Sequence, residues 1–407
     1  MARTEVASCR LWSGRIMWNT YICDTMSGLI ITPIDIQNFS WHMSVTDSSL
    51  STNTRRNVGE NGLSQISLPW ASVPADTPEG RNNILYPMKR SIVLMWDDIP
   101  VVFGMIGYRV DSEDCTDFSL LSIQDLLSSR YLVSEDVFGK SYGGTTNDTI
   151  YYKNMSLRGI AADIINKCTR GKPSGELPID TQYDGEPGGH QRTYYGYNVS
   201  NNAADKLLNE ISNVQDGVEM RFVPYKRENN VRLRFEAGTD GEHELVNGST
   251  KRTLTWFSNG RGTIEGLKVS NIGPTMRVYG TGAGQDDSTL CHLAQDLSLC
   301  QTRDPWPIVE TVISDTSWDN QDLLKKHAEG ALATSRYPLC QMRGSVHIND
   351  FDDQFIGMVW PGDLIDLDIR DHPSLPDGVY TVRILRMEGD STDKVSLTFS
   401  VMKSTSY

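Results

Sequence analysis

The sequence predicts a mainly β protein with α+β insertions, in which two small β-barrels form the framework. The first observation is the alternation of apolar and polar side chains in three stretches near the C-terminus, residues 365–370, 380–386 and 395–401. The second is the turn chemistry around them, at Pro361-Gly362, Pro376-Asp377-Gly378 and Gly389-Asp390. Strands joined this tightly are antiparallel neighbours. Their apolar face and free edges need cover, which a small barrel or a sandwich provides.

Length and composition limit the number of folding units and the classes of function. Its 407 residues predict about two to four folding units. The formal net charge of −14, without any Lys/Arg block, argues against a protein that holds nucleic acid firmly. The seven cysteines show neither metal-binding pairs nor a disulfide framework, so we expect reduced core residues.

The sequence predicts no membrane span and no secretory signal. The best apolar run, Ile92–Ile106, is interrupted by Asp97-Asp98. The N-terminus lacks the apolar region of a signal peptide, so we expect synthesis in a cytoplasm.

Residues 1–111 are predicted to form the first β-barrel domain. A hairpin opens it, with strands over 16–22 and 29–33 and a polar turn at Asp24–Gly28. Further alternating stretches follow at 39–45, 66–68 and 92–96. A second hairpin runs from Trp96 to Ile106 through Asp97-Asp98, and Gly104 and Gly107 in its second strand predict a bulge or a sharp bend.

Residues 112–261 are predicted to form an α+β insertion domain. Ser122 reads as the N-cap of a short helix. A stronger helix starts at Ser156 and carries apolar residues at helical spacing as far as Cys168, and Gly171 lies where a C-terminal cap would. The Gly/Pro/Asp-rich stretch 171–192 predicts a loop or linker. The remaining expected elements are a helix over 202–211 and a hairpin of strands 218–223 and 231–235.

Residues 262–285 and 338–407 are predicted to form the second β-barrel domain, interrupted by a helical insertion over 286–337. Strands are expected over 262–270 and 275–279. The helix of the insertion spans Trp318–Leu332 and is entered at Ser317 or Asp319.

No motif predicts catalysis, a cofactor or a metal ion. The stretch Gly280-Thr-Gly282-Ala-Gly284 lacks the Lys-Ser/Thr of a phosphate-binding loop and reads as a flexible loop at a strand end. The stretch His347–Asp353 offers oxygen ligands but lacks the glycine and the terminal glutamate of a calcium loop, so a solvated acidic loop is the favoured interpretation. The sequence therefore predicts no catalytic residues, no cofactor-binding residues and no metal-binding residues.

The pattern Tyr21-Ile-Cys-Asp24-Thr-Met-Ser-Gly28-Leu-Ile-Ile-Thr-Pro33-Ile34, followed by Ser40-Trp41, resembles the start of minor tail proteins of long-tailed phages that infect actinobacteria. The same likeness extends to the Trp96–Ile106 hairpin, to Val278–Gly284, to the helix over Asp322–Leu332, and to Trp360–Asp363 and Gly378–Ile384. The resemblance implies the hub of a siphovirus-type tail tip, similar in fold to the baseplate hub of contractile phages and to the base of type VI secretion spikes. In that fold, two related β-barrels per subunit build a pseudo-sixfold ring from a trimer.

The resemblance therefore implies a structural, non-enzymatic homotrimer at the distal tip of the virion's tail, made in the host bacterial cytoplasm. It would join the tail tube and the distal tail protein ring to a central tail fibre or spike. Further implied partners are other minor tail proteins and the C-terminus of the tape measure protein. The hub would be the conduit through which the tape measure protein leaves first and the DNA follows. DNA would therefore contact the hub only in transit. Two alternatives stay open: a distal-tail ring protein, and a tail-associated cell-wall hydrolase.

The net charge of −14 suggests a hypothesis about the conduit. Asp97-Asp98, Asp286-Asp287 and the acids of Asp350–Asp353 are candidates for loops near the channel, where they would repel phosphate. The alternative interpretation is that these acids are solvated turns on an outer rim, since turns are commonly acidic.

Overall fold

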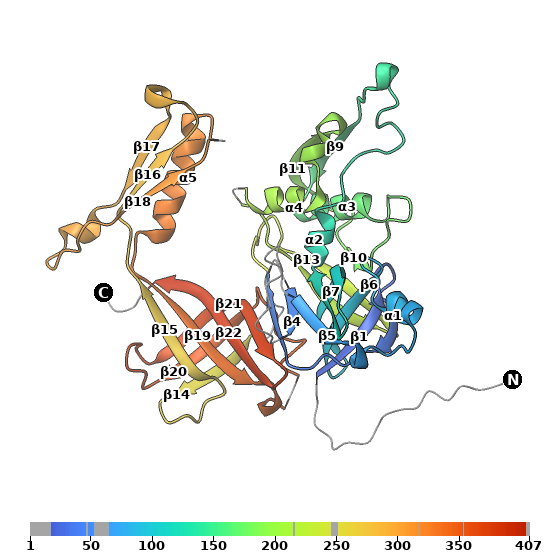
Figure 1. Cartoon of the computed structure of the whole chain (residues 1–407). Helices are drawn as coiled ribbons and strands as arrows, with labels where there is room; N and C mark the ends of the chain where they lie inside the picture. Colours follow the sequence, from blue (N-terminus) through green and yellow to red (C-terminus); the bar gives the residue numbers. More distant parts are fainter. Residues whose placement is uncertain are drawn as a thin grey trace. The chain divides into compact units, whose positions relative to one another are not determined.

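The computed structural model describes residues 18–45, 48–52, 65–214, 216–245, 251–316, 318–352 and 354–403. The chain divides into two compact units, each assembled from separate stretches of sequence. The first comprises Met1–Thr250, His347–Asp363 and Arg386–Val395, and the second comprises Lys251–Val346, Leu364–Leu385 and Ser396–Tyr407. Strands dominate both units, and helices are inserted among them (Figure 1). The predicted fold class, mainly β with α+β insertions, is confirmed.

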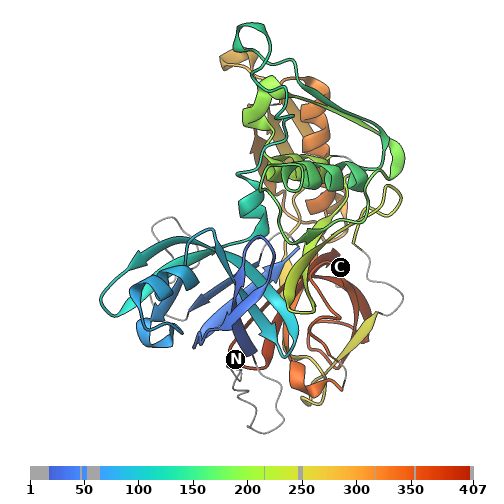
Figure 2. The ribbon, with the colours of Figure 1, turned by 90° about the vertical axis from the view of Figure 1, so that its right-hand side faces the viewer.

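A six-stranded antiparallel sheet is the framework of the first unit. Its strands follow the order β2-β1-β6-β7-β8-β5 and lie side by side in both views (Figure 1, Figure 2). Their bounds are Trp18–Asp24 (β1), Ile30–Pro33 (β2), Gln65–Pro69 (β5), Arg90–Trp96 (β6), Ile99–Asp111 (β7) and Cys115–Leu121 (β8), and helix α1 (Pro78–Ile84) lies between β5 and β6 in the chain. The predicted opening hairpin is confirmed by the antiparallel pairing of β1 and β2.

The second predicted hairpin is confirmed by β6 and β7. Trp96 faces Ile99 across the ladder, so Asp97 and Asp98 form the two-residue turn. Asp97 adopts the left-handed backbone conformation, with φ of 53°. Aspartate tolerates this conformation better than most residues do, which explains why an acidic pair serves as the turn.

The predicted irregularity at Gly107 is confirmed as a bulge in β7. The register of β7 on β8 shifts between Ile106 and Arg109. A Cβ atom on Gly107 would lie 2.7 Å from the hydroxyl oxygen of Ser119, so the bulge has no space for a larger residue. Bulges of this kind bend a strand, as a small barrel requires.

A second group of strands in the first unit surrounds an aromatic cluster. The hairpin of β3 (Phe39–Ser44) and β4 (Ser48–Thr52) pairs with the part of β21 (Gly378–Asp390) that begins at Arg386. The ring of Trp18 lies 5.2 Å from the ring of Trp41 and 4.9 Å from that of Trp96. The Trp18 indole nitrogen also donates to the carbonyl oxygen of Thr392 at 2.7 Å. Aromatic pairs of this geometry add about 0.5–1.5 kcal/mol each beyond the burial of their area.

The α+β part of the first unit shares its core with the six-stranded sheet. Its elements are α2 (Ile123–Leu127), β9 (Thr149–Met155), α3 (Leu157–Cys168), β10 (Ile179–Asp180), β11 (Pro187–Tyr195), α4 (Ala204–Ser212), β12 (Met220–Arg227) and β13 (Asn230–Ala237). The core cluster joins the apolar faces of α3 and α4 to side chains of the sheet such as Val93 and Phe103. The predicted hairpin of β12 and β13 is confirmed.

Helix α3 confirms the predicted start at Ser156, which is its N-cap, and the predicted apolar face. The Ser156 hydroxyl accepts a hydrogen bond from the Gly159 amide at 3.0 Å, and an N-cap of this kind is worth about 1 kcal/mol. The six apolar positions of the predicted face are fully buried: Leu157, Ile160, Ala161, Ile164, Ile165 and Cys168. Thr169 is the C-cap residue of α3, and Gly171 lies two positions beyond it. The Gly171 amide donates to the Asn166 carbonyl at 2.9 Å and so satisfies a carbonyl of the last turn, as the predicted C-terminal cap would.

The stretch 171–192, predicted as a loop, contains the strand β10 and most of the strand β11. β10 pairs in parallel with β13, and β11 pairs antiparallel with β9. The prediction is therefore wrong for these residues. Glycine and proline normally argue against a strand, but here the register of β11 shifts between Pro187 and His190, so the Pro-Gly-Gly sequence occupies an irregular strand end.

The second unit is built on a barrel-like sheet. Its strands follow the order β14-β20-β21-β22-β19-β15, with bounds Arg252–Phe257 (β14), Glu265–Ile272 (β15), Leu339–His347 (β19), Leu364–Arg370 (β20) and Lys394–Lys403 (β22). The first and last strands of this order are consecutive in the chain, and the Ile264 amide donates to the Thr255 carbonyl at 3.1 Å. The three predicted strands of the C-terminal meander are confirmed, whereas β14, which pairs in parallel with β20, was not predicted.

A small sheet with one helix is inserted in the second unit. β16 (Arg277–Thr281) pairs with β17 (Cys291–Gln295) and with β18 (Glu310–Ser314), and α5 (Gln321–Ser335) packs on them through Ala328 and Leu332. The N-cap of α5 is Asn320, whose side chain accepts from the Leu323 amide at 2.8 Å, which corrects the predicted start at Ser317 or Asp319. The domain boundaries at residues 111, 261, 285 and 337 stay predictions. None of the helices in the described residues is long and apolar enough to cross a membrane.

Candidate functional site

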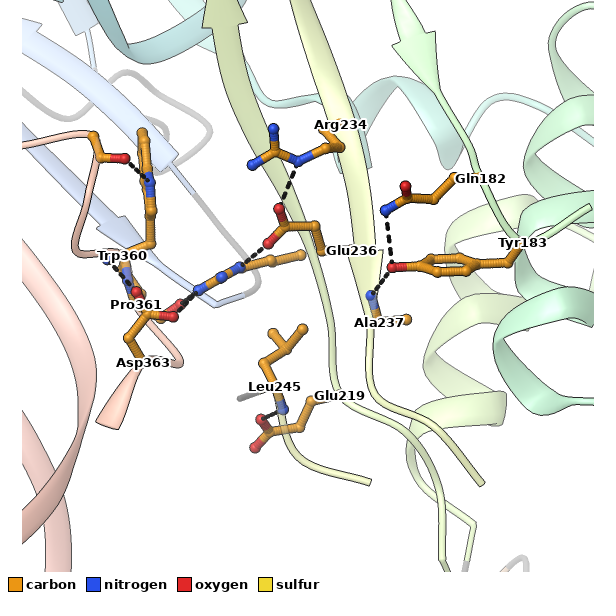
Figure 3. Close-up of polar contacts among 12 residues, drawn as sticks. Gln182, Tyr183, Glu219, Arg234, Glu236, Ala237, Leu245, Trp360, Pro361 and Asp363 are labelled. Atoms are coloured by element: carbon orange, nitrogen blue, oxygen red, sulfur yellow. Dashed lines mark hydrogen bonds and ion pairs between the residues drawn. The ribbon is translucent and has the colours of Figure 1, made fainter. Parts of the chain in front are cut away.

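A network of charged groups in the first unit centres on Arg221 of β12. Figure 3 shows its partners Glu236 and Asp363, with Arg234 beside Glu236. The Arg221 Nε atom lies 2.8 Å from Glu236 Oε2, and its Nη1 atom lies 2.8 Å from Asp363 Oδ1. Nη1 also donates to the Pro361 carbonyl oxygen at 2.8 Å. The other oxygen of Glu236 accepts from Arg234 Nε at 2.6 Å. One guanidinium thus connects both strands of the β12–β13 hairpin to the turn that ends at Asp363.

The sequence builds this turn from four consecutive residues, Trp360-Pro-Gly-Asp363. Asp363 Oδ2 accepts from the Trp360 amide at 2.9 Å, and the Asp363 amide donates to the Trp360 carbonyl at 3.0 Å. Gly362 has a φ of 98°, a conformation that favours glycine. The turn predicted at Pro361-Gly362 is therefore confirmed. It holds its carboxylate toward Arg221, with only 2% of Asp363 exposed.

Burial and the neighbouring charges have opposite effects on the pKa values of Arg221 and Asp363. Burial raises the pKa of the Asp363 carboxyl, while the neighbouring charge of Arg221 and the hydrogen bond from the Trp360 amide act against this rise. Burial disfavours the charge on Arg221 as well, but the carboxylates of Asp363 and Glu236 outweigh that effect and raise the pKa of the guanidinium. Since a buried ion pair that loses one partner leaves an uncompensated charge, the two residues depend on one another.

A hollow of about 370 Å³ adjoins this network. Both arginines on its described wall are already paired, because Arg158 Nη2 lies 2.5 Å from Glu186 Oε1 and Arg221 binds its two carboxylates. The Arg158 guanidinium also lies 4.4 Å from the centre of the Tyr183 ring. The groups around the hollow hold strands and loops of this unit together, and their arrangement is that of a structural joint.

Two of the acidic loops predicted to lie near a channel have defined surroundings. Asp98 lies in the β6–β7 turn and forms an ion pair of 2.6 Å with Lys226 of β12, although 80% of its side chain is exposed. Asp286 and Asp287 are exposed and belong to a short 3-10 helix, Asp286–Ser288, in the second unit. Whether either loop lines a channel stays a prediction.

The third acidic stretch belongs to the first unit and is organised by Asp393. His347 Nδ1 lies 3.2 Å from Asp393 Oδ1, and Asn349 Nδ2 donates to Asp393 Oδ2 at 3.1 Å. Asp350 and Asp352 are exposed, while Asp353 lies outside the described residues. Among the residues that the structure describes, no three histidine, cysteine or acidic side chains are gathered as ligands for one metal ion.

The glycine-rich stretch 280–284, predicted as a flexible loop, is largely ordered. Gly280 is part of β16. The Gly282 amide donates to the Leu290 carbonyl and the Ala283 amide to the Trp318 carbonyl, both at 2.8 Å. These bonds continue the contacts of β16 past its end, so the backbone amides are directed into the fold instead of toward a phosphate.

The sequence alone did not distinguish Arg221, Glu236 or Asp363 as members of a site. Around the first two it predicted only a hairpin of strands 218–223 and 231–235. The partner that buries Arg221 stands 142 positions further along the chain. The one available signal was the Trp360–Asp363 stretch, which contains a predicted turn and resembles the corresponding stretch of minor tail proteins.

No family model matches the chain, and no curated protein matches it. Among solved structures, the chain is similar to the 43 kDa tail protein of prophage MuSo2 from Shewanella oneidensis, with 10% identity, 94% of this chain and 98% of that chain covered, and a TM-score of 0.46. It is also similar to the prophage tail protein gp18 from Listeria monocytogenes, with 12% identity, 95% of both chains covered and a TM-score of 0.42. A third is the E. coli c3393 protein, described as a type VI secretion component similar to T4 tail proteins gp27 and gp5. It shows 13% identity and a TM-score of 0.42, with 95% of this chain and 77% of that chain covered.

Proposed function

We propose that the chain is a structural hub of a bacteriophage tail tip. The observation that carries this proposal is that one chain holds two β-sheet units, each with an α+β part. In the first unit this part follows the six-stranded sheet, and in the second it interrupts the barrel-like sheet. The sequence motifs that resemble minor tail proteins fall in both units, for example the β1–β2 hairpin in the first and Val278–Gly284 in the second. In this role the chain joins the tail tube and the distal tail protein ring to a central fibre or spike.

The symmetry of such a joint explains why one chain carries two sheet units. A tail tube is sixfold and a central fibre is threefold, so a homotrimer whose subunits each contribute two barrels presents six barrels to one side and three subunits to the other. The six-stranded sheet of the first unit leaves β2 and β5 at its edges. Edge strands need a cover or a partner, and neighbouring subunits of a ring can supply one.

The proposed role is mechanical rather than enzymatic. The charged groups around Arg221 and Arg158 are engaged with one another in ion pairs that hold the fold. The net charge of −14 suits a conduit that lets the tape measure protein and then DNA pass without retaining them.

Antibody labelling of intact particles tests this proposal. Gold-labelled antibodies against the purified chain should bind at the distal tip of the tail in electron micrographs. Labelling along the tube or on the capsid, or no labelling of particles whose proteins include the chain, would contradict it. Zymography on host cell walls tests the hydrolase alternative, because a structural hub should leave no cleared zone.

A further inference from the structure

Exposed aromatic and apolar side chains gather at one end of the two-stranded β9–β11 ribbon. Thr149 at the start of β9 faces Tyr195 at the end of β11, so the segment before β9 and the segment after β11 leave the ribbon at the same end. Both segments lie beyond that end of the ribbon (Figure 1). The exposed residues, which we call the aromatic tip, are Tyr131, Val137, Phe138, Tyr142, Tyr195 and Tyr197.

One buried residue, Asp148, connects the two segments through its side chain and its backbone. Asp148 is 6% exposed, and its Oδ2 atom accepts from the Ser134 amide at 2.7 Å. Its carbonyl oxygen accepts from the Gly196 amide at 2.8 Å. A Cβ atom on Gly196 would lie 2.8 Å from the Asp148 side chain, so the approach is close. The tip is therefore fixed to the ribbon at its base.

Tyr142 is presented by a small closed turn. The Ser141 amide donates to the Thr145 carbonyl at 3.0 Å, and the Gly144 amide donates to the Ser141 carbonyl at 3.0 Å. Gly143 and Gly144 both have positive φ, which lets the chain reverse directly after the tyrosine. The Tyr142 side chain is fully exposed, at 102% of its reference area. Its ring is free on both faces.

Tyr195 and Tyr197 form a stacked pair where the chain leaves β11. Their ring centres lie 5.2 Å apart with an angle of 21° between the planes. Tyr197 is 68% exposed, so stacking on Tyr195 orients its ring without covering it. A ring oriented in advance loses little conformational freedom when a ligand binds.

The tip carries almost no free charge. Its segments, residues 131–148 and 195–203, contain four charged residues, Glu135, Asp136, Lys140 and Asp148. Asp148 is buried, and Glu135 is paired with Lys172 at 2.8 Å. Asp136 and Lys140 remain, with opposite charges. The other polar groups are the hydroxyls and amides of serine, threonine and asparagine.

We propose that the aromatic tip binds a neutral polysaccharide. A sugar ring offers an apolar C–H face, which fits the electron-rich face of an exposed aromatic ring, and a rim of hydroxyls, which fits tyrosine hydroxyls and neutral amides. The absence of a cationic group beyond Lys140 in these described segments disfavours an anionic polymer or an anionic membrane surface. The aromatic tip also contains no arginine in these described segments, and arginine is enriched at the centre of protein interfaces. The proposal is independent of the hub assignment.

Affinity electrophoresis of the full chain tests the proposal. The probes are gels that contain a neutral glucan, a neutral mannan or a neutral galactan, with polygalacturonate as the anionic comparison. Migration should be retarded in at least one neutral gel and not in polygalacturonate, and added salt should not abolish the effect. The variants Tyr142→Ala and Tyr197→Ala should each weaken the retardation about three- to tenfold.

Two controls keep the test specific. Tyr86→Ala removes an exposed tyrosine of another part of the first unit and should leave retardation unchanged, and Tyr197→Phe should keep most of it because the ring is retained. All variants should unfold at the same temperature as the parent chain. Unretarded migration in all neutral gels, or equal retardation of the parent and both alanine variants, would overturn the proposal. So would tip variants that retain glycan binding but no longer enter the particle, because the tip would then be a protein contact.

Discussion

Arg221 and Asp363 form an ion pair of 2.8 Å in the first unit although 142 positions separate them in the sequence. The side chains are 11% and 2% exposed. The pair connects the β12–β13 hairpin to the last residue that the first unit contributes before the chain continues into β20 of the second.

Removing the charge of Arg221 should destabilise the first unit strongly. Arg221→Met leaves Asp363 and Glu236 without their shared counter-charge, and breaking a buried pair typically costs about 3–5 kcal/mol. The free energy of unfolding from urea titrations followed by tryptophan fluorescence should fall accordingly. Lys325→Met, which breaks an exposed pair with Glu329 on α5, serves as the control and should change stability by less than about 0.5 kcal/mol. Equal small effects in both variants would show that the Arg221 pair is not a joint.

Gly28 should not tolerate alanine. It has a φ of 71°, and a Cβ atom would lie 1.9 Å from the Val231 carbonyl oxygen. Gly28→Ala therefore adds a collision to a backbone strain of about 1–3 kcal/mol. Gly185→Ala is the matched control, because Gly185 has a φ of 69° and open space around it. Thermal unfolding should show a much larger loss for the first variant, and similar midpoints for the two would refute the steric argument.

Acid should destabilise the first unit through Asp180 and Glu186. Hydrogen bonds and charge from Arg232 lower the pKa of Asp180, and those from Arg158 lower the pKa of Glu186. A carboxyl whose pKa is lower in the folded than in the unfolded chain adds stability above the unfolded pKa of about 4. That stability disappears as the pH falls through the folded value. The urea midpoint should therefore decline below pH of about 4, and Asp180→Asn should flatten the decline. A midpoint rising in acid would contradict this.

The acidic balance predicts weak binding to DNA. A filter-binding assay at low salt, where electrostatic attraction is strongest, should show no appreciable affinity of the purified chain for duplex DNA. In a map of the assembled tail tip, the inner wall should carry net negative charge. A lumen lined by lysine and arginine would contradict the hypothesis that acidic loops face the channel.

Local chemistry determined which parts of this fold could be predicted. The turn at Asp97-Asp98, the start of α3 at Ser156 and the apolar face of α3 depend on residues a few positions apart, and all three predictions are confirmed. The strand β11 was missed because its Pro-Gly-Gly start has the composition of a loop. The Arg221 network was missed for a different reason: its partners meet only after the chain has folded, and neither position alone distinguishes a buried arginine from an exposed one.

The copy number and symmetry of the chain at the tail tip test the hub proposal most directly. A cryo-electron microscopy map of the intact tip should contain three copies around a threefold axis, each supplying two barrels to one ring of six. Six equivalent copies with one barrel each in the ring would contradict the hub proposal and identify a distal-tail ring protein instead.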